Sequence, residues 1–403
     1  MNPLLSPRQE KYFILTLAGI QFCHILDFMI MMPLGPILME ELGIHSHEFG
    51  FLVASYSFSA AVSGILAATF VDLFDRKKLM LFMFFMFGVA TLACGLAPGY
   101  VTLFLARGLT GVFGGVIGAL VQTMVGDVIP YSRRAKASGI ISTAFAVSTV
   151  AGVPLSLWLA THIQWRMPFI FIVLLSLLFI LFGLRTLPVL RQHVHERPNA
   201  HPFSAMFEVL RNANHLRALF YSALVIFSGF TIIPYITIYA VNNVGILQYD
   251  IPIVYLFGGT ATLFSARLIG QWADQYGKVK VYRWLAVAAI LPLLLVTHIG
   301  AVSLPVWLIC TTSFFVLISG RMIPAITIIT SAAEPGLRGT FMSLNGTVQS
   351  LSMGLATMIA GLVITQNIKG EIIGYQEVGY IAVFSNMLAI LFVARIVIHD
   401  RQG

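Results

Sequence analysis

The stretch AATFVDLFDRKK (residues 67–78) recurs in outline as IGQWADQYGKVK (residues 269–280). Each stretch ends an apolar run with an aspartate and continues to lysine or arginine. Asp72 and Asp274 are separated by almost half of the 403-residue chain. The turns that begin at Pro130 and Pro335 form a second such pair. Chance similarity of two short basic loops is the alternative, but both pairs predict a chain made of two halves with the same order of elements.

Composition places these halves in a membrane. Hydrophobic residues make up 58% of the chain and charged residues only 10%, against roughly 25% charged in soluble domains, and the mean hydropathy is +0.89. The formal net charge of +8 does not indicate a nucleic-acid partner, because the basic residues lie in short clusters between apolar runs and form no continuous patch. We therefore predict an integral membrane protein in contact with the lipid bilayer.

Apolar runs long enough to cross about 30 Å of hydrocarbon as helices number twelve. They lie at 12–38, 48–72, 78–97, 100–125, 137–162, 168–187, 216–241, 251–273, 280–300, 304–331, 339–365 and 377–398. The first contains Asp27 and lacks a small-residue cleavage site, so we expect it to be retained. The predicted fold is all-α, with twelve transmembrane helices in two six-helix halves, 1–187 and 216–403, joined by a cytoplasmic linker, 188–215.

The loops differ in their content of lysine and arginine. One set of connections holds most of these residues: Arg8, Lys11, Arg76, Lys77, Lys78, Arg133, Arg134, Lys136, Arg191, Arg197, Arg211, Lys278, Lys280, Arg283, Arg338 and Arg401. The other set holds Arg166 and Lys369. The positive-inside rule then predicts a multi-pass protein of a bacterial-type inner (plasma) membrane, with both termini in the cytoplasm. The cysteines Cys23, Cys94 and Cys310 all fall within spans and are expected to be free thiols.

Two parallel halves joined by a long linker are typical of transporters that rock around a binding cavity near the bilayer midplane. The motifs resemble those of the major facilitator superfamily, and in particular its twelve-span drug–proton antiporter branch, which includes sugar-efflux-like permeases. In the loop after span two, Asp72, Arg76 and Lys77 fit the signature Gly-x-x-x-Asp-Arg/Lys-x-Gly-Arg/Lys-Arg/Lys. Departures from that signature are Ala68, Leu73 and Asp75, and the repeat copy keeps Gly270, Asp274, Gly277 and Lys278.

Three further segments bear on the resemblance. LARGLTGVFGG (105–115) is similar to the Arg-x-x-x-Gly motif of span four through Arg107 and Gly111. LDFMIMMPLGP (26–36) is similar to the Leu-Asp-x-Thr…Pro pattern of span one, with Met29 in place of threonine. STVAGVPLSLW (148–158) keeps only part of the Gly-Pro-x-x-Gly-Gly motif of span five in antiporters. The resemblance to the antiporter branch thus favours export, although the span-five segment does not contain the complete antiporter motif.

Asp27 is the one carboxylate deep within a predicted span. Fifteen residues from the start of span one place it at a depth of roughly 22 Å, where the ionised form is disfavoured, so reversible protonation can couple a proton gradient to transport. The alternative is an Asp27 that is permanently paired with an arginine or that caps a broken helix. His24 either relays this proton or orients Asp27, or it simply hydrogen-bonds in the cavity wall.

Two arginines within predicted spans are candidates for proton coupling or substrate binding. Arg107, in span four, cannot realistically lose its proton, and the resemblance implies that it shifts the proton affinity of the carboxylate; the alternative is a snorkelling side chain near the outer face. Arg321, in span ten, has no deep acid in its own half. It either reaches Asp27 across the cavity or, as we favour, contacts an anionic group of the substrate.

Charged residues near the cytoplasmic span ends are candidates for a gate. Asp72, Arg76 and Asp127, with Asp274 and Lys278 in the repeat, are expected to hold the inner faces together; ordinary solvation of helix ends is the alternative. Polar groups within spans are candidates for the lining of the substrate cavity. With Arg107 and Arg321, these are Tyr56, Gln122, Tyr235, Tyr239, Asn345 and Gln349.

These observations predict a proton-coupled secondary transporter that moves a small molecule by alternating access, with export as the favoured direction. Proton-coupled uptake of a nutrient or a metal chelate such as a siderophore is the alternative, and a non-transporting sensor is another. The chain has no His-Glu-x-x-His, nucleophile elbow or phosphate-binding loop, so we expect no enzyme and no cofactor. HSHE (45–48) and HVHE (193–196) are too short and isolated to predict a metal site. A monomer is sufficient for this mechanism.

Overall fold

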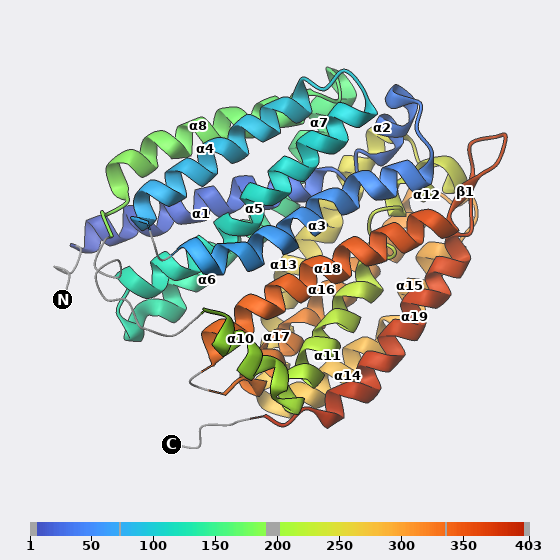
Figure 1. Ribbon diagram of the computed structural model, residues 1–403. Coiled ribbons are helices and arrows are strands. Elements are labelled where there is room, and N and C mark those ends of the chain that lie inside the picture. Colours follow the sequence, from blue (N-terminus) through green and yellow to red (C-terminus); the bar gives the residue numbers. More distant parts are fainter. Residues whose placement is uncertain (1–5, 72–73, 191–201, 335–336, 399–403) are drawn as a thin grey trace. The chain divides into compact units, whose positions relative to one another are not determined.

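The computed structural model describes residues 6–71, 74–190, 202–334 and 337–398 (Figure 1). These residues form helices and one short two-stranded sheet, as the prediction of an all-α membrane fold requires. The chain divides into two compact units. Unit 1 comprises Met1–Met31 and Phe58–Ala200, and unit 2 comprises Met32–Ser57 and His201–Gly403.

Unit 1 is a bundle of long helices. They are α1 (Pro7–Ile30), the second part of α3 (Ser46–Phe70), α4 (Arg76–Gly95), α5 (Tyr100–Val128), α6 (Tyr131–Val147), α7 (Val153–His162) and α8 (Met167–Thr186). Helices α1, α4 and α8 lie side by side (Figure 1). A capping box on Ser6 begins α1, and the Asp75 side chain accepts bonds from the first backbone N–H groups of α4. A π-helical turn, Ser148–Gly152, separates α6 from α7 just before Pro154.

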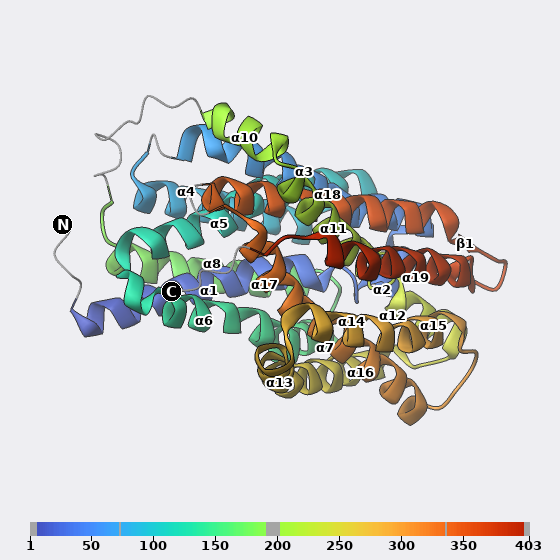
Figure 2. The ribbon, with the colours of Figure 1, turned by 90° about the horizontal axis from the view of Figure 1, so that it is seen from below.

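Unit 2 contains α2 (Gly35–Leu42) and the start of α3. It also contains α10 (Pro202–Arg211), α11 (Ala213–Phe230), α12 (Ile236–Tyr239), α13 (Ile251–Tyr276), α14 (Lys278–Ala288), α15 (Ile290–His298), α16 (Leu304–Gly320), α17 (Met322–Ala332), α18 (Arg338–Val363) and α19 (Tyr375–Phe392). Strands β1 (Thr365–Gln366) and β2 (Ile372–Ile373) form an antiparallel pair. Helix α11 packs against α18 and α19 (Figure 1), and α13 packs against α16 (Figure 2). Helix α10 lies within the predicted linker, where its Val209 joins the hydrophobic core of unit 2.

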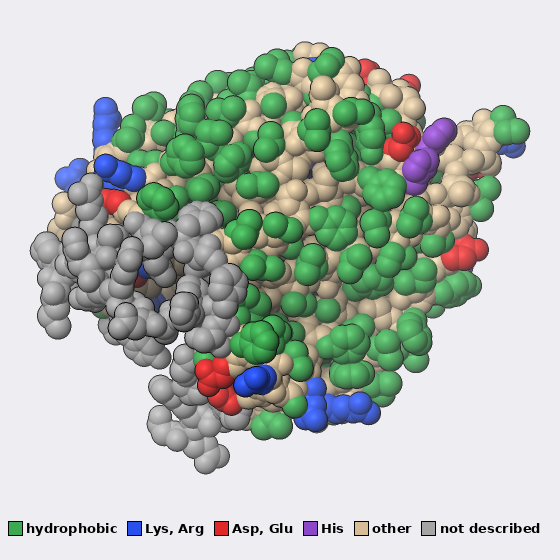
Figure 3. All heavy atoms as spheres, in the orientation of Figure 1, with side chains coloured by type: hydrophobic (Ala, Val, Ile, Leu, Met, Phe, Trp, Pro, Cys, Tyr) green, Lys and Arg blue, Asp and Glu red, His purple; other side chains and the backbone are tan. Residues whose placement is uncertain are grey.

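Eleven helical segments in the described residues are long and apolar enough to cross a membrane. The remaining predicted span, 216–241, corresponds to α11, a turn and α12, so the count of twelve stays a prediction. Large apolar side chains such as Leu181 and Phe264 are exposed, and Figure 3 shows hydrophobic side chains covering most of the visible surface, with lysine and arginine gathered near its margins. This distribution fits a surface that faces lipid.

Helix interruptions occur inside several of the apolar segments. The chain turns at 31–34 between α1 and α2, and again at 231–235 between α11 and α12. Each turn contains a proline, Pro33 or Pro234, which cannot supply a backbone N–H to a continuing helix. At Arg321, between α16 and α17, the irregularity is a single residue, and the i→i−4 backbone bonds to Leu317 and from Ala325 continue through it. The two proline-containing turns leave backbone groups available near the middle of a membrane segment.

Candidate functional site

The centre of unit 1 holds a buried ion pair. Asp27 lies three residues before the end of α1 and is 0% exposed, and Arg107 of α5 is 1% exposed. Arg107 Nη1 donates to Asp27 Oδ2 at 2.6 Å and to the Asp27 backbone oxygen at 3.4 Å. Thr91 Oγ1 of α4 donates to the other carboxylate oxygen at 3.3 Å. Asp27 thus joins three helices, and Arg107 lies inside the unit rather than at its surface.

His24 lies one helical turn before Asp27 on α1. Its ring packs edge-on against Phe87 of α4, with ring centroids 6.0 Å apart. The contact holds the imidazole on the side of α1 that faces α4. A role for His24 in passing a proton stays a prediction.

The centre of unit 2 holds a second buried arginine with a different set of partners. Arg321 is 0% exposed and sits at the junction between α16 and α17. Its Nη1 donates to Asn386 Oδ1 of α19. Its Nη2 donates to Ser228 Oγ at 2.5 Å and to the Val225 backbone oxygen at 3.1 Å. Within the described residues, Arg321 Nε has no hydrogen-bond partner and the guanidinium forms no ion pair.

Two tyrosines predicted to line the cavity are buried in unit 2 and bonded to backbone. The Tyr235 hydroxyl lies 3.3 Å from the Ser46 carbonyl oxygen and 3.2 Å from that of Thr357, so it donates to one or is shared between them. It occupies a notch where Gly50 of α3 meets Gly361 of α18: a Cβ on Gly50 would lie 3.2 Å from Gly361 Cα. The Tyr239 hydroxyl donates to the Ile299 carbonyl at 2.8 Å.

The remaining predicted lining residues lie on three helices, α18, α3 and α5. Asn345 and Gln349 are one turn apart on α18; Asn345 is 4% exposed, and its Oδ1 has no partner among the described residues. Gln349 Nε2 donates to Ser222 Oγ of α11 at 3.1 Å. Tyr56 is buried on the part of α3 that belongs to unit 2, whereas Gln122 is exposed on α5. The structure therefore joins Gln349 to α11 but does not bring Gln122 near the Asp27 pair through any contact.

The predicted gate residues form two unequal pairs. Arg76 Nε lies 2.5 Å from Asp127 Oδ2, which ties the start of α4 to the end of α5 within unit 1. In unit 2, Lys278 Nζ lies 4.0 Å from Asp274 Oδ1, and both side chains are exposed, at 39% and 81%. Asp72 lies outside the described residues. Sequence reasoning missed the capping role of Asp75 and the 2.9 Å ion pair between Arg133 and Glu10; an aspartate directly before a helix was the available signal for the first.

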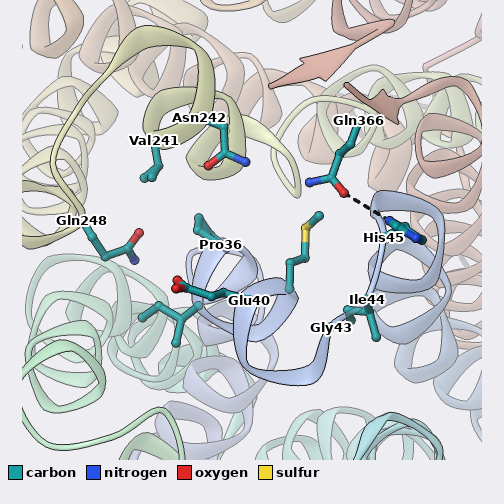
Figure 4. A pocket seen from close by; sticks show the side chains of 11 residues that line it. Pro36, Glu40, Gly43, Ile44, His45, Val241, Asn242, Gln248 and Gln366 are labelled. Carbon is teal, nitrogen blue, oxygen red and sulfur yellow. Dashed lines mark hydrogen bonds between the residues drawn. The ribbon is translucent and has the colours of Figure 1, made fainter. Parts of the chain in front are cut away.

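A cavity of about 460 Å³ opens at one end of unit 2. Figure 4 shows the side chains of Glu40 and Gln248 extending toward the same space, and His45 bonded to Gln366 at 3.5 Å. Both Glu40 and His45 are exposed, so this is a surface vestibule and not a buried site. In the HSHE segment, Glu48 accepts a bond from the His45 backbone N–H, which is a helix-start role; the HVHE segment lies outside the described residues.

Long apolar helices, proline-containing turns within two of the apolar segments, and buried arginines bonded to residues just before those turns are features of a multi-pass membrane transporter. The sequence model of the Major Facilitator Superfamily matches residues 17–357. The chain belongs to the major facilitator superfamily, as its motifs predicted.

Relatives of similar length carry transporter and drug-resistance names. The chain is 22% identical over 378 residues to the uncharacterized MFS-type transporter YceJ of Bacillus subtilis, covering 93% of this chain and 92% of that one. It is 24% identical over 368 residues to Multidrug resistance protein 2 of the same organism (89% and 90%). It is 23% identical over 364 residues to the quinolone resistance protein NorA of Staphylococcus aureus (89% and 91%).

Other matches are more local or concern the fold alone. The B. subtilis MFS-type transporter YhcA is 31% identical over 156 residues, which span 39% of this chain and 29% of that protein. Among solved structures, a bacterial homologue of the human lysosomal transporter Spinster aligns with a TM-score of 0.75 at 15% identity, covering 99% of this chain and 100% of the other. This likeness establishes the shared helical fold.

Proposed function

We propose that this transporter is a proton-coupled exporter of small molecules, with Asp27 as the group that gains and loses the proton. The observation that carries the proposal is the Asp27–Arg107 pair, at 2.6 Å and almost fully buried. Two charges removed from water are tolerated only while they stay paired. A change that separates them must therefore neutralise the carboxylate, and the available neutralising agent is a proton.

The position of Asp27 suits such a coupling. It lies just before the turn at 31–34 that divides the first apolar segment into α1 and α2. A movement of α1 relative to α5 changes the distance between the carboxylate and Arg107, and the turn is a place where the backbone can absorb it. Proton uptake at Asp27 would then favour the separated arrangement, and proton release would favour the paired one. In this proposal the six-helix halves 1–187 and 216–403 move relative to each other, the shift of α1 against α5 is a smaller change within the first half, and each protein molecule acts as a monomer.

Export is the favoured direction because relatives aligned over most of their length bear the names Multidrug resistance protein 2 and Quinolone resistance protein NorA. Those relatives come from bacteria, and the distribution of lysine and arginine favours cytoplasmic termini, so we place the protein in a bacterial inner membrane. The alternative is proton-coupled uptake of a nutrient or a metal chelate, which the buried cation Arg321 favours. The two functions differ in the sign of the coupled proton flux.

The decisive experiment measures proton movement in proteoliposomes with a pH dye inside the vesicles. Organic cations, sugars and acidic chelates are added in turn to the native protein and to Asp27→Asn. We expect one class of compound to move protons against its own direction of transport, and Asp27→Asn to reduce this flux to the level of empty vesicles. Glu41→Gln, which removes an exposed charge from the same part of the chain, is the matched control and should keep the native flux.

Two results would contradict the proposal. Flux that persists in Asp27→Asn would move the proton site elsewhere, and flux in the same direction as the compound would establish uptake. The gate is tested separately with Asp72→Asn, by labelling single cysteines from the cytoplasmic side. We expect faster labelling, because a weakened cytoplasmic contact favours the inward-open state. Unchanged labelling would show that Asp72 has no gating role and is an ordinary solvated residue at a helix end.

A further inference from the structure

We propose that the polar cluster around Arg321 is an anion site that receives a carboxylate group of the transported compound. The cluster consists of Arg321, Asn386 and Ser228, with the backbone oxygen of Val225. The inference rests on the proposed transport function and assigns a substrate class to it. Compounds that carry a carboxylate, including zwitterions, are expected to bind better than their neutral esters.

The internal repeat shows which group is missing from this cluster. Asp27 and Ser228 are as far apart in the sequence as Pro33 and Pro234, the prolines of the two helix breaks. Asp27 and Ser228 therefore occupy equivalent positions of α1 and α11, each just before a break. Both contact a buried arginine, Arg107 in one unit and Arg321 in the other. Where unit 1 supplies a carboxylate to its arginine, unit 2 supplies a hydroxyl.

Among the residues that the structure describes, no carboxylate neutralises the charge of Arg321. A guanidinium carries five N–H donors, and three hydrogen bonds are formed, all to neutral oxygens. Nε is buried with no partner among the described residues. An isolated buried cation is costly unless an anion accompanies it. A carboxylate is the matching anion, because its two oxygens can accept parallel bonds from Nε and Nη2, and it has to displace only the Ser228 hydroxyl from Nη2.

The surroundings of Arg321 favour binding over a purely structural role. Arg321 lies at a one-residue irregularity between α16 and α17, where the i→i−4 backbone bonds continue, and Ser228 precedes the proline-containing turn at 231–235. Helix breaks like the one after Ser228 form substrate sites in membrane transporters. They also provide the places where a site that is closed in the present structure can open. Tyr221 and Tyr282, both fully buried, lie beside the guanidinium, and their exclusion of water strengthens the attraction of Arg321 for an anion.

The test compares binding of an acid with binding of its ester. The probes are a quinolone carboxylic acid, its methyl ester, and ethidium as a cation without a carboxylate, each measured by equilibrium binding to the purified full-length protein. We expect the native protein to bind the acid about tenfold more tightly than the ester, the ratio that one charge-assisted hydrogen bond provides. Arg321→Gln and Ser228→Asp should both reduce the ratio to about one, the first by removing the cation and the second by supplying an internal carboxylate.

Controls separate this result from misfolding and from the coupling mechanism. Arg267→Gln removes an exposed arginine of α13 and should keep the tenfold ratio. The affinity for ethidium should stay within twofold of the native value in every variant. If Arg321→Gln no longer binds ethidium, that variant is misfolded, and the acid-to-ester ratio of Ser228→Asp then tests the proposal. Asp27→Asn should keep the acid preference, because the assay has no proton gradient, so a failure of proton coupling leaves this result intact.

Three outcomes would overturn the anion site. The native protein could bind acid and ester equally or bind neither, Ser228→Asp could retain the preference for the acid, or Arg267→Gln could lose as much as Arg321→Gln.

Discussion

Each unit holds a buried arginine within an apolar segment, and the two arginines have different electrostatic balance. Arg107 is paired with Asp27 at 2.6 Å and is neutralised within its own unit. Arg321 is bonded to an amide, a hydroxyl and a carbonyl, and no described carboxylate pairs with it. The same contrast appears in the repeated loops, where Arg76 forms a close pair with Asp127 but Lys278 makes only a long, exposed contact with Asp274.

This difference suggests that the two units have different roles in transport. A site whose cation already has a carboxylate partner can exchange a proton without a ligand. A site whose cation has only neutral partners can take its anion from a ligand. Proton exchange at Asp27 and ligand binding at Arg321 are coupled if the two sites change conformation together. Each site lies close to a proline-containing break, where a movement of the backbone would alter it. The predictions below test this contrast by changing the charge balance in one unit at a time.

The largest expected effect is the unequal cost of removing the two arginines. Arg107→Met leaves Asp27 as an unpaired buried charge and should lower the free energy of unfolding by about 3–5 kcal/mol. Arg321→Met removes a cation that has no ionic partner, and the loss should be only about 1–2 kcal/mol from hydrogen bonds left unmade. Unfolding of the purified variants in one detergent, followed by tryptophan fluorescence, gives the two values.

The control for this comparison is the double variant Asp27→Asn with Arg107→Met, which should recover part of the lost stability because no charge is left unpaired. If Arg107→Met and Arg321→Met lower the free energy of unfolding equally, the two sites do not differ in charge balance. The proposed assignment of different roles to the two units would then be wrong.

A smaller effect of opposite sign is expected from making unit 2 resemble unit 1. Ser228→Asp places a carboxylate at the position equivalent to Asp27, within reach of Arg321 Nη2. A charge-assisted hydrogen bond should raise the free energy of unfolding by about 1–3 kcal/mol. Ser228→Asn is the control, because asparagine has nearly the same shape as aspartate but no charge, and it should show no such gain. Destabilisation by Ser228→Asp greater than by Ser228→Asn would mean that Arg321 is already neutralised.

Much of the fold follows from the sequence because the bilayer imposes a simple pattern. Long apolar runs and the repeat of Asp72 at Asp274 were sufficient to predict the all-α transporter fold. Asp27 and Arg107 also stand out, since charged residues are rare at that depth.

The partners of Arg321 could not be predicted in the same way. Ser228 and Asn386 are neutral residues in apolar segments. Their residue type and neighbouring sequence do not distinguish them from other polar residues such as Gln122, which proved to be exposed. The sequence prediction did not include Ser228, although its spacing from Pro234 equals that of Asp27 from Pro33. Tyr235 was predicted to line a cavity from its residue type, but its place in the glycine notch depends on how closely α3 and α18 approach, which hydropathy does not encode.

The smallest expected effects lie in the repeated loops, where the same contrast between units should be visible. Arg76 is 7% exposed and bonded at 2.5 Å to a carboxylate that is 34% exposed, so Arg76→Gln should cost about 1 kcal/mol, the upper end of values for partly exposed pairs. Lys278→Gln breaks an exposed contact of 4.0 Å between residues four apart, for which about 0.2 kcal/mol is expected. Raising the salt concentration should weaken the second pair more than the first, because solvent ions screen exposed charges most effectively. Measuring both variants at low and high salt therefore separates a partly buried structural pair in unit 1 from ordinary solvation of a helix end in unit 2. Comparable losses with the same salt dependence would show that the loops do not share the contrast between Arg107 and Arg321.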